Sequence, residues 1–195
     1  MQHIVAVSGG KDSTALALRL AEVEPREYTY VCTPTGDEGD EFYTHIRSLS
    51  TILGKPILPI MHPLGLNGLI TKQNALPNYR QRWCTRMLKI EPFRAFLASQ
   101  APAVSYVGLR ADEEGRMGGA YDDLVGITMR FPLREWGWGL DEVWGYLDQR
   151  SIAIPRRLDC QRCFFQTLYE WWHLSRGVCR GRSTRSHDRI YLSLR

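Results

Sequence analysis

The sequence opens with HIVAVSGGKDSTALALRL, residues 3–20, and this stretch decides the fold. Residues 4–7 are apolar, as in a buried strand, whereas Leu16, Leu20 and Val23 recur at the three- and four-residue intervals of a helix with one buried face. Between them stands the hexapeptide SGGKDS. A strand, a glycine-rich loop and a helix in this order direct backbone N–H groups and the helix dipole onto an anion. The stretch therefore predicts a phosphate-binding loop.

The alternation of strands and helices continues along the chain. Apolar runs predict strands at residues 4–7, 28–32, 57–60 and 104–108. Helical periodicity predicts helices at residues 13–21, 41–53, 90–100 and 140–150. Strands that alternate with helices form βαβ units on a parallel sheet. The predicted fold class is therefore α/β, a single-domain parallel sheet with helices on both faces.

The division of the chain follows from where the pattern weakens. Residues 1–166 are predicted to form one nucleotide-binding domain, and residues 167–195 a C-terminal helix with a basic tail. Residues 64–82 and 110–126 have weak periodicity and are rich in Gly, Asn and charge. Long loops of a compact α/β domain usually carry function, so both stretches are candidate substrate-binding loops.

Composition and charge limit the class of protein. The chain of 195 residues contains no run of eighteen apolar residues and opens directly on a strand, so we expect a soluble, cytoplasmic protein without a membrane partner. Residues 176–195 hold six arginines and one acid, and they supply the whole positive net charge of +4. Such a tail can contact the phosphates of nucleic acid, or it can be a solvated end without a partner.

Each residue of the hexapeptide has a predicted role at a nucleotide phosphate. The glycines let the backbone approach the phosphates, Lys11 and the serine hydroxyls donate to them, and Asp12 is expected to help hold Mg²⁺. A Walker A loop requires Ser or Thr after the lysine, where Asp12 stands, so ordinary γ-phosphoryl transfer is not predicted. The predicted nucleotide-binding residues of this loop are Ser8, Gly9, Gly10, Lys11, Asp12 and Ser13.

The hexapeptide resembles the signature of the PP-loop ATP pyrophosphatases, the adenine nucleotide alpha hydrolase superfamily. All six positions match, directly after an N-terminal strand. The resemblance implies a Rossmann-like fold and an ATP-dependent reaction. In that reaction the bond between the α- and β-phosphates breaks, pyrophosphate leaves and an acceptor is adenylylated. Lys11 would then stabilise the charge on the departing pyrophosphate.

Four further stretches resemble the phosphoadenosine phosphosulfate (PAPS) reductase family, which includes sulfate adenylyltransferase small subunits and DNA phosphorothioation sulfurtransferases. They are TPTGDE at residues 33–38, RWCTRMLKIEP at 82–92, GLRADEEGR at 108–116 and FPL at 131–133, followed by Trp136. Thr33 replaces an aspartate of the family pattern, and Glu114 replaces a serine. The resemblance covers about residues 4–166.

This resemblance extends the candidate site beyond the hexapeptide. It implies that Thr35, Gly36, Gly108 and Arg110 join the nucleotide site. It also implies that Arg110 and Arg116, with Lys11, act in catalysis by contacting a phosphate, sulfate or other anionic group, because loops after parallel strands are where α/β sheets bind ligands. By contrast, Trp136, Trp138 and Trp144 are expected to be core residues.

The cysteines suggest metal chemistry. Four thiolates suit an iron–sulfur cluster or a structural zinc ion, and unligated thiols remain the third alternative. In related assimilatory reductases and phosphorothioation enzymes an early cysteine and a late C-x-x-C share a four-iron cluster, although here Trp83 stands where the reductases have a second early cysteine. Cys32, in an apolar run, is expected in the core. The candidate ligands are Cys84, Cys160, Cys163 and Cys179.

The leading functional hypothesis is an ATP-dependent adenylylating enzyme for sulfur transfer. Its expected partners are the adenine nucleotide, an unidentified acceptor, a sulfur donor protein and, through the basic tail, nucleic acid. One alternative is an enzyme like the reductases of PAPS or adenosine phosphosulfate. An intact phosphate loop favours ATP, because those reductases usually carry a degraded loop, and their C-terminal E-C-G-[IL]-H segment does not occur here. A metal-binding nucleic-acid accessory protein is the alternative of another class.

Overall fold

A five-stranded parallel sheet forms the centre of the computed structural model, which describes residues 1–116, 121, 123–155, 158–168 and 171–172. The strand order is β3-β2-β1-β4-β5, and every neighbouring pair is parallel. The strands are β1 (Gln2–Ala6), β2 (Tyr28–Cys32), β3 (Ile57–Pro59), β4 (Ala103–Tyr106) and β5 (Ile127–Arg130). The α/β fold predicted from the sequence is confirmed.

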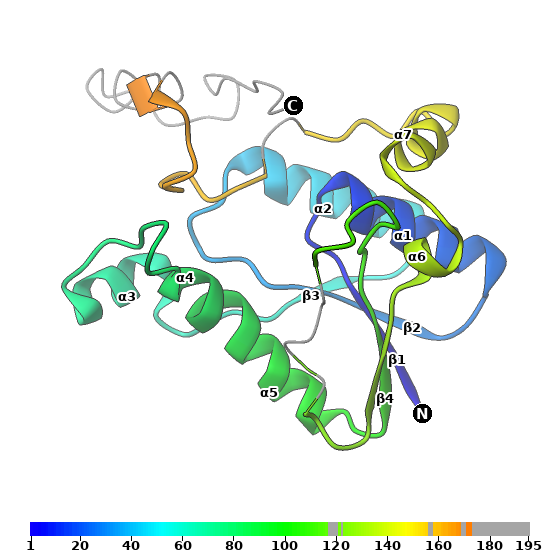
Figure 1. Cartoon of the computed structure of the whole chain (residues 1–195), viewed down its shortest axis with the longest axis horizontal. Coiled ribbons are helices and arrows are strands. Elements are labelled where there is room, and N and C mark those ends of the chain that lie inside the picture. The colour runs from blue at the N-terminus through cyan, green and yellow to red at the C-terminus, as the bar shows by residue number, and fades with distance from the viewer. Residues whose placement is uncertain (117–120, 122, 156–157, 169–170, 173–195) are drawn as a thin grey trace.

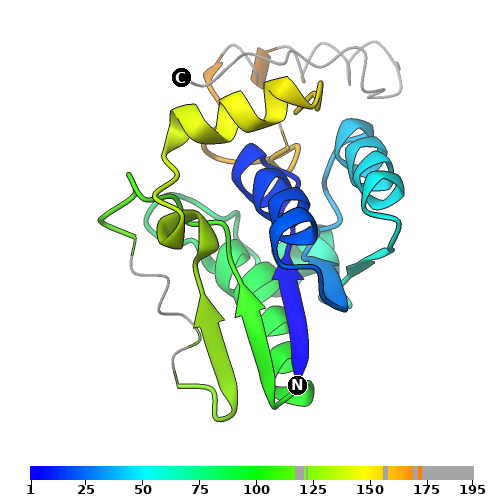
Figure 2. The ribbon, with the colours of Figure 1, turned by 90° about the vertical axis from the view of Figure 1, so that its right-hand side faces the viewer.

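Helices lie on both faces of the sheet (Figures 1 and 2). One face is covered by α1 (Lys11–Val23), α2 (Asp40–Leu53) and α7 (Leu140–Gln149), and the other face by α5 (Glu91–Ser99). The shorter elements are α3 (Gly65–Gln73), α4 (Trp83–Thr85), a π-helical turn η1 (Arg86–Ile90) and α6 (Pro132–Glu135). The four helices expected from periodicity are all present, because each turns an apolar stripe toward a sheet that needs covering.

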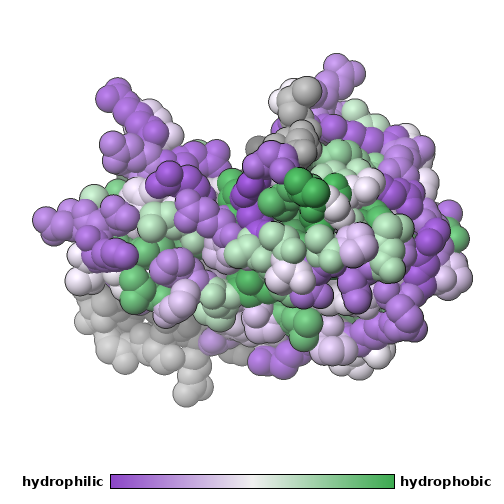
Figure 3. Space-filling model, turned by 90° about the horizontal axis from the view of Figure 1, so that it is seen from below, coloured by the Kyte–Doolittle hydropathy of each residue, from purple (hydrophilic) through white to green (hydrophobic). Residues whose placement is uncertain are grey.

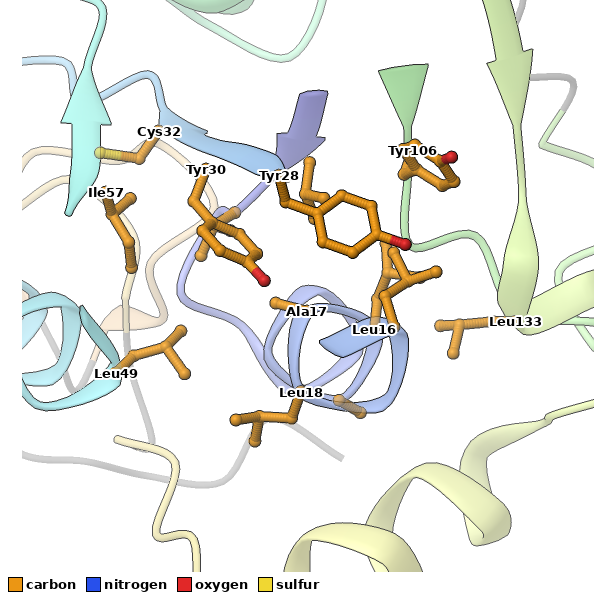
Figure 4. Close-up of a cluster of buried hydrophobic side chains, with 14 of the residues drawn as sticks. Leu16, Ala17, Leu18, Tyr28, Tyr30, Cys32, Leu49, Ile57, Tyr106 and Leu133 are labelled. Carbon is orange, nitrogen blue, oxygen red and sulfur yellow. The ribbon is translucent and has the colours of Figure 1, made fainter. Parts of the chain in front are cut away.

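The period of two in a strand divides the apolar residues between two cores. Val5 and Val7 point toward α1, whereas Ile4 packs with Phe93 and Leu97 of α5. The larger core, on the α1 side, is shown in Figure 4, where Leu16 and Ala17 of α1 lie under Tyr28 and Tyr30 of β2. Because α1 is buried from Ser13 to Leu18 and again at Leu20, the start of the helix and the loop before it are held firmly.

The strand order places the two candidate segments next to each other. The chain leaves β1 for β2 on one side and later returns to β4 on the other side, so the connections after β1 and β4 run in opposite directions. A crevice at the carboxyl ends of strands is expected at such a reversal. Residues 8–13 follow β1 and residues 107–116 follow β4, and both segments border this point.

Two regions differ from the sequence predictions. Residues 64–82 are not a loop throughout, because they contain α3, which buries Leu66 and Leu69. The strand β5 was not predicted, since its four residues are only partly buried at the sheet edge and show little alternation. Trp136 and Trp138 pack on the main core as expected. Trp144 is 39% exposed, so its assignment to the core was wrong.

The surface mixes polar and apolar residues. Figure 3 shows hydrophobic residues interspersed with hydrophilic ones across the middle of one face. Within the part of the chain that the structure describes, no helix is long and apolar enough to cross a membrane. Most of residues 167–195, including the basic tail, lie outside the described residues, so the domain boundary at residue 166 stays a prediction.

Candidate nucleotide-binding site

The phosphate loop, residues 8–13, is held by its own serines. Ser13 Oγ accepts a hydrogen bond from the Ser8 amide (3.1 Å), donates to the Gly10 carbonyl (3.0 Å) and lies 3.0 Å from Ser8 Oγ. Gly9 has φ of +82°, in the left-handed region that favours glycine. The Ser13 side chain, which is buried, therefore fixes the shape of the loop, in addition to the donor role expected from the sequence.

The N-terminus of α1 opens on this loop without a side-chain cap. Gly10 is the N-cap residue, and it has no side chain to accept from the first amides of the helix. The first amides of any α-helix have no partner within the helix, and its dipole adds positive potential there. The loop therefore presents the features of an anion site at the end of a 13-residue helix.

Gly108, after β4, touches the backbone of this helix end. A Cβ atom at Gly108 would lie 3.1 Å from the Asp12 carbonyl carbon and 3.2 Å from the Ser13 amide nitrogen. These atoms belong to the first turn of α1 and cannot move without moving the loop. A Cβ atom here would be tightly crowded and would push these backbone atoms by a few tenths of an ångström, so glycine suits the close approach of the two segments.

A cavity of about 280 Å³ lies between these two segments. This volume is near the lower end of the range for ligand sites, about 300 to 1,000 Å³. Its lining combines polar and cationic groups (the phosphate loop, Lys89 and Arg116) with apolar and aromatic side chains (Val31, Phe93 and Tyr121). A cavity with both kinds of group suits a ligand that has anionic groups and a ring.

Arg110 is engaged with carboxylates. Its Nη1 donates to both oxygens of Asp12, each at 3.1 Å, and its Nε donates to Asp112 (2.8 Å). The side chain is only 14% exposed, and it does not line the cavity. Arg110 thus links the loop after β4 to the phosphate loop. The role of Asp12 in holding Mg²⁺ stays a prediction.

Lys11 and Arg116 are placed differently from each other. Lys11 lies 3.4 Å from Asp12 and does not line the cavity, whereas Arg116 does line it. The Arg116 guanidinium also donates to Glu113 at 2.7 Å, and its side chain is 65% exposed. Of the three residues predicted to be catalytic, Arg116 is thus the one that borders the cavity.

A buried histidine supports the phosphate loop from below. The hydroxyl of Thr14 donates to the Gly9 carbonyl (3.3 Å) and lies 3.3 Å from Nε2 of His45, on α2. Burial lowers the pKa of His45, and a hydrogen bond with the Gly9 backbone opposes that shift. The imidazole therefore favours its neutral form beside the loop at Gly9.

Thr35 and Gly36 lie at a second, adjacent cavity. Glu38 accepts hydrogen bonds from the Thr35 amide (2.7 Å), the Thr35 hydroxyl (2.8 Å) and the Gly36 amide (3.0 Å). Thr35 lines a cavity of about 100 Å³ that also contains cysteines. Within the described residues, neither Thr35 nor Gly36 lines the 280 Å³ cavity; of the residues after β2, it is Thr33 that does.

Three cysteines predicted to act together line this smaller cavity. Cys84, Cys160 and Cys163 come from α4 and from the loop beyond α7, and all three are thiols rather than disulfides. A hydrogen bond with Cys163, and then burial, raise the pKa of Cys160. Cys32 is buried in the core as expected, and burial raises its pKa to about 11. Cys179 lies outside the described residues.

An ion pair ties the C-x-x-C segment to the chain after β2. Arg162, between the two cysteines, donates through Nε to both oxygens of Asp37 (3.1 and 3.2 Å) and through its amide to the same carboxylate (3.0 Å). The Gln161 amide donates to the Asp37 carbonyl at 2.7 Å. Asp37 is buried, and it fixes where the cysteines lie relative to β2.

These cysteines do not by themselves complete a metal site. Among the residues that the structure describes, no group of three or more His, Cys, Asp or Glu side chains is arranged to hold a metal ion. The sequence prediction that the three cysteines gather at one place agrees with the structure. Their ligation of iron–sulfur or zinc, with Cys179 as fourth ligand, stays a prediction.

Lys89 is the functional candidate that sequence reasoning did not select. It lines both the 280 Å³ cavity and the cysteine cavity, and it stands on η1 between them. The signal was available, because Lys89 lies in the stretch at residues 82–92 that resembles the family. It was missed because a lysine five residues from the nearest cysteine gives no sign in the sequence that it faces two cavities.

Comparison with known proteins identifies the family. The model of the phosphoadenosine phosphosulfate reductase domain matches residues 2–158. The crystal structure of phosphoadenylyl-sulfate (PAPS) reductase from Candida auris, a phosphate complex, is similar with a TM-score of 0.59 and 12% identity, covering 79% of this chain and 75% of that chain. This likeness shows that the two proteins share a fold. The search of curated proteins finds no match. This chain therefore belongs to the PAPS reductase domain family, whose members are related to enzymes of adenine sulfonucleotides.

Proposed function

We propose that this chain binds ATP at the phosphate loop and cleaves its α–β phosphate bond to adenylylate an acceptor for sulfur transfer. The observation that carries the proposal is the intact hexapeptide of residues 8–13, folded at the uncapped start of α1 and bordering a cavity with cationic side chains. A loop of this kind is suited to phosphates beyond the α-position, which a sulfonucleotide lacks.

The proposed reaction divides into steps that these residues can assist. An oxygen of the acceptor attacks the α-phosphorus, the bond to the bridging oxygen breaks, and pyrophosphate leaves with the electron pair. The amides at the start of α1 and the charge of Lys11 stabilise the pyrophosphate. Arg116 and Lys89, which line the cavity, neutralise the oxygens of the α-phosphate. A sulfur nucleophile later displaces AMP from the adenylylated acceptor.

The position of Lys89 supports a connection between nucleotide and cysteines. A cation on the wall shared by two cavities can contact an anion in the first while it lowers the energy of a thiolate in the second. Sulfur delivered through Cys84, Cys160 or Cys163 would then arrive beside the adenylylated group. In the same proposal the metal hypothesis is secondary, and anaerobic protein that is brown and loses its colour in Cys160→Ser would support an iron–sulfur cluster.

The alternative within the family is an enzyme that acts on PAPS or adenosine phosphosulfate. Family membership favours a sulfonucleotide, whereas the intact loop favours ATP. A nucleic-acid accessory protein, the alternative of another class, depends on the basic tail, which lies outside the described residues. The experiment that separates the three is to mix the protein with ATP, with PAPS and with adenosine phosphosulfate, each with candidate acceptors or a thiol reductant.

The products of that experiment decide among the hypotheses. Release of pyrophosphate with ATP supports the proposal. Release of sulfite from either sulfonucleotide, without pyrophosphate from ATP, would replace it with a reductase. If neither product forms and the protein retains nucleic acid, the accessory hypothesis becomes the better one.

A further inference from the structure

One arginine outside the cavity holds the loop that supplies Arg116. Arg134, on α6, donates through Nε to the carbonyl of Arg110 (3.2 Å) and through Nη2 to the carbonyls of Glu113 (2.7 Å) and Arg116 (2.6 Å). Its guanidinium also lies over the ring of Phe131, 5.6 Å from the centroid. A planar guanidinium is the side chain suited to such a contact, because its N–H groups diverge in a fixed plane.

The carbonyls of Arg110, Glu113 and Arg116 lie at three successive points along the turn of residues 110–116. The Glu113 amide donates to the Arg110 carbonyl (3.3 Å), and the Arg116 amide donates to the Glu113 carbonyl (3.1 Å). Arg134 thus joins the start, middle and end of residues 110–116 to the helix that follows β5. Figure 1 shows α6 beside the segment after β4, close to α1.

The two halves of this turn are secured differently. At the first half, the Ala111 amide donates to the Trp138 carbonyl (2.8 Å), and Asp112 accepts from the Leu140 amide (3.1 Å). At the second half, Arg134 reaches from beyond the turn and donates to the carbonyls of Glu113 and Arg116. The position of Arg116 therefore depends on Arg134 more than the position of Arg110 does.

We propose that Arg134 is a positioning residue of the nucleotide cavity: it fixes the turn from Glu113 to Arg116 and so places the Arg116 guanidinium at the cavity wall. The inference rests on the proposed function, since it assumes that the cavity receives an anionic nucleotide. Arg134 does not line the cavity itself, so its effect on binding passes through Arg116.

The test is a double-mutant cycle on the full chain with ATP as the probe, measured by calorimetry. Arg116→Ala and Arg134→Lys should each weaken ATP binding about tenfold, because a lysine keeps the charge but cannot reach three carbonyls. In the Arg134→Lys background, Arg116→Ala should then cost less than about twofold more. Arg150→Lys is the matched control. Arg150 also donates two hydrogen bonds through its guanidinium, to Glu22 (2.8 and 2.9 Å), but Glu22 lies near the end of α1, away from the phosphate loop at its start.

Hydrogen exchange of the protein without ATP tests the positioning role of Arg134 separately from the proposed binding of ATP. The amides of Glu113 and Arg116 should exchange faster in Arg134→Lys than in the unmodified protein, whereas the amide of Ala111 should not change. If the unmodified protein binds no ATP, the proposed function fails, and exchange alone decides what Arg134 does. If exchange at Glu113 and Arg116 is unchanged, or if the effects of Arg134→Lys and Arg116→Ala on binding simply add, Arg134 does not position the turn.

Discussion

The 280 Å³ cavity, proposed to bind the nucleotide, and the cysteine cavity share Lys89 but are built in different ways. The first rests on residues 8–13, a contiguous segment whose hydrogen bonds join serines five residues apart. The second gathers α4, the chain after β2 and the C-x-x-C segment, and depends on the ion pair between Asp37 and Arg162 across 125 positions. Local sequence dictates the loop on which the first cavity rests, whereas tertiary contacts dictate the position of the cysteines at the second.

This difference predicts which kind of substitution should disturb each site most. In the phosphate loop the shape comes from the backbone, so a steric change at the backbone should matter more than loss of one charge. At the cysteine cavity the shape comes from one charged link, so loss of that charge should matter more than a steric change nearby. Three variants test this contrast, in order of expected effect.

The largest effect is expected from Gly108→Ala. The added methyl group would lie 3.1 to 3.2 Å from backbone atoms of Asp12 and Ser13 and would displace the start of α1. We expect ATP affinity to fall about tenfold or more and stability to fall by about 1 to 3 kcal/mol. Calorimetry and thermal denaturation measure the two quantities.

The matched control for this variant is Gly145→Ala, on α7, where an added Cβ would meet no atom within 4 Å. This change should leave ATP binding unaltered and, as a helix-interior Gly→Ala, stabilise the fold by about 0.4 to 1 kcal/mol. Equal ATP affinity in the Gly108 and Gly145 variants would remove the steric argument.

The second prediction concerns the link at the cysteine cavity. Asp37→Asn keeps the shape of the side chain but removes the charge that Arg162 contacts. We expect the free energy of unfolding to fall by about 1 to 3 kcal/mol. The thiols of Cys160 and Cys163 should then react faster with a disulfide reagent, while ATP binding stays within about twofold. Asp40→Asn, at an exposed carboxylate on the same segment, is the control and should leave thiol reactivity unchanged.

The smallest effect is a pH dependence at His45. Burial lowers its pKa, so the folded protein resists a proton that the unfolded chain accepts below a pH of about 6.5. The stability that this neutral imidazole contributes is present above that pH and declines as the pH falls below it. Thermal denaturation should show that stability falls more steeply from pH 7.5 to 5.5 in the unmodified protein than in His45→Gln. If stability falls equally with pH in the two proteins, His45 is not the source of the pH dependence.

The sequence predicted the fold, including the strand, loop and helix at residues 3–20, because these elements depend on local patterns. The strand at residues 4–7, the hexapeptide and the stripe of Leu16 and Leu20 occupy neighbouring positions, and their meaning does not depend on the rest of the chain. The proximity of Cys84 to Cys160 was expected from the resemblance to the family. Its structural basis, Asp37 paired with Arg162, was not, because nothing in the sequence indicates a contact across 125 positions.

Other misses have the same physical cause. The carboxylate partners of Arg110, Asp12 and Asp112, were not predicted, because packing decides which carboxylates a guanidinium meets; its contact with a ligand stays a prediction. Lys89 was passed over because its position between two cavities appears only when η1 is placed beside the sheet. The strand β5 escaped notice because an edge strand of four residues has no continuous apolar run.

The central claim is that the 280 Å³ cavity is the site of an adenine nucleotide. Calorimetric titration with ATP, comparing the unmodified protein with Lys89→Ala and Lys72→Ala, tests it most directly. Lys89 lines the cavity, whereas Lys72 is an exposed lysine in the last turn of α3. The account predicts one binding site, an affinity about tenfold weaker in Lys89→Ala, and no change in Lys72→Ala. Binding of ATP with equal affinity to all three proteins, or to none of them, would contradict it.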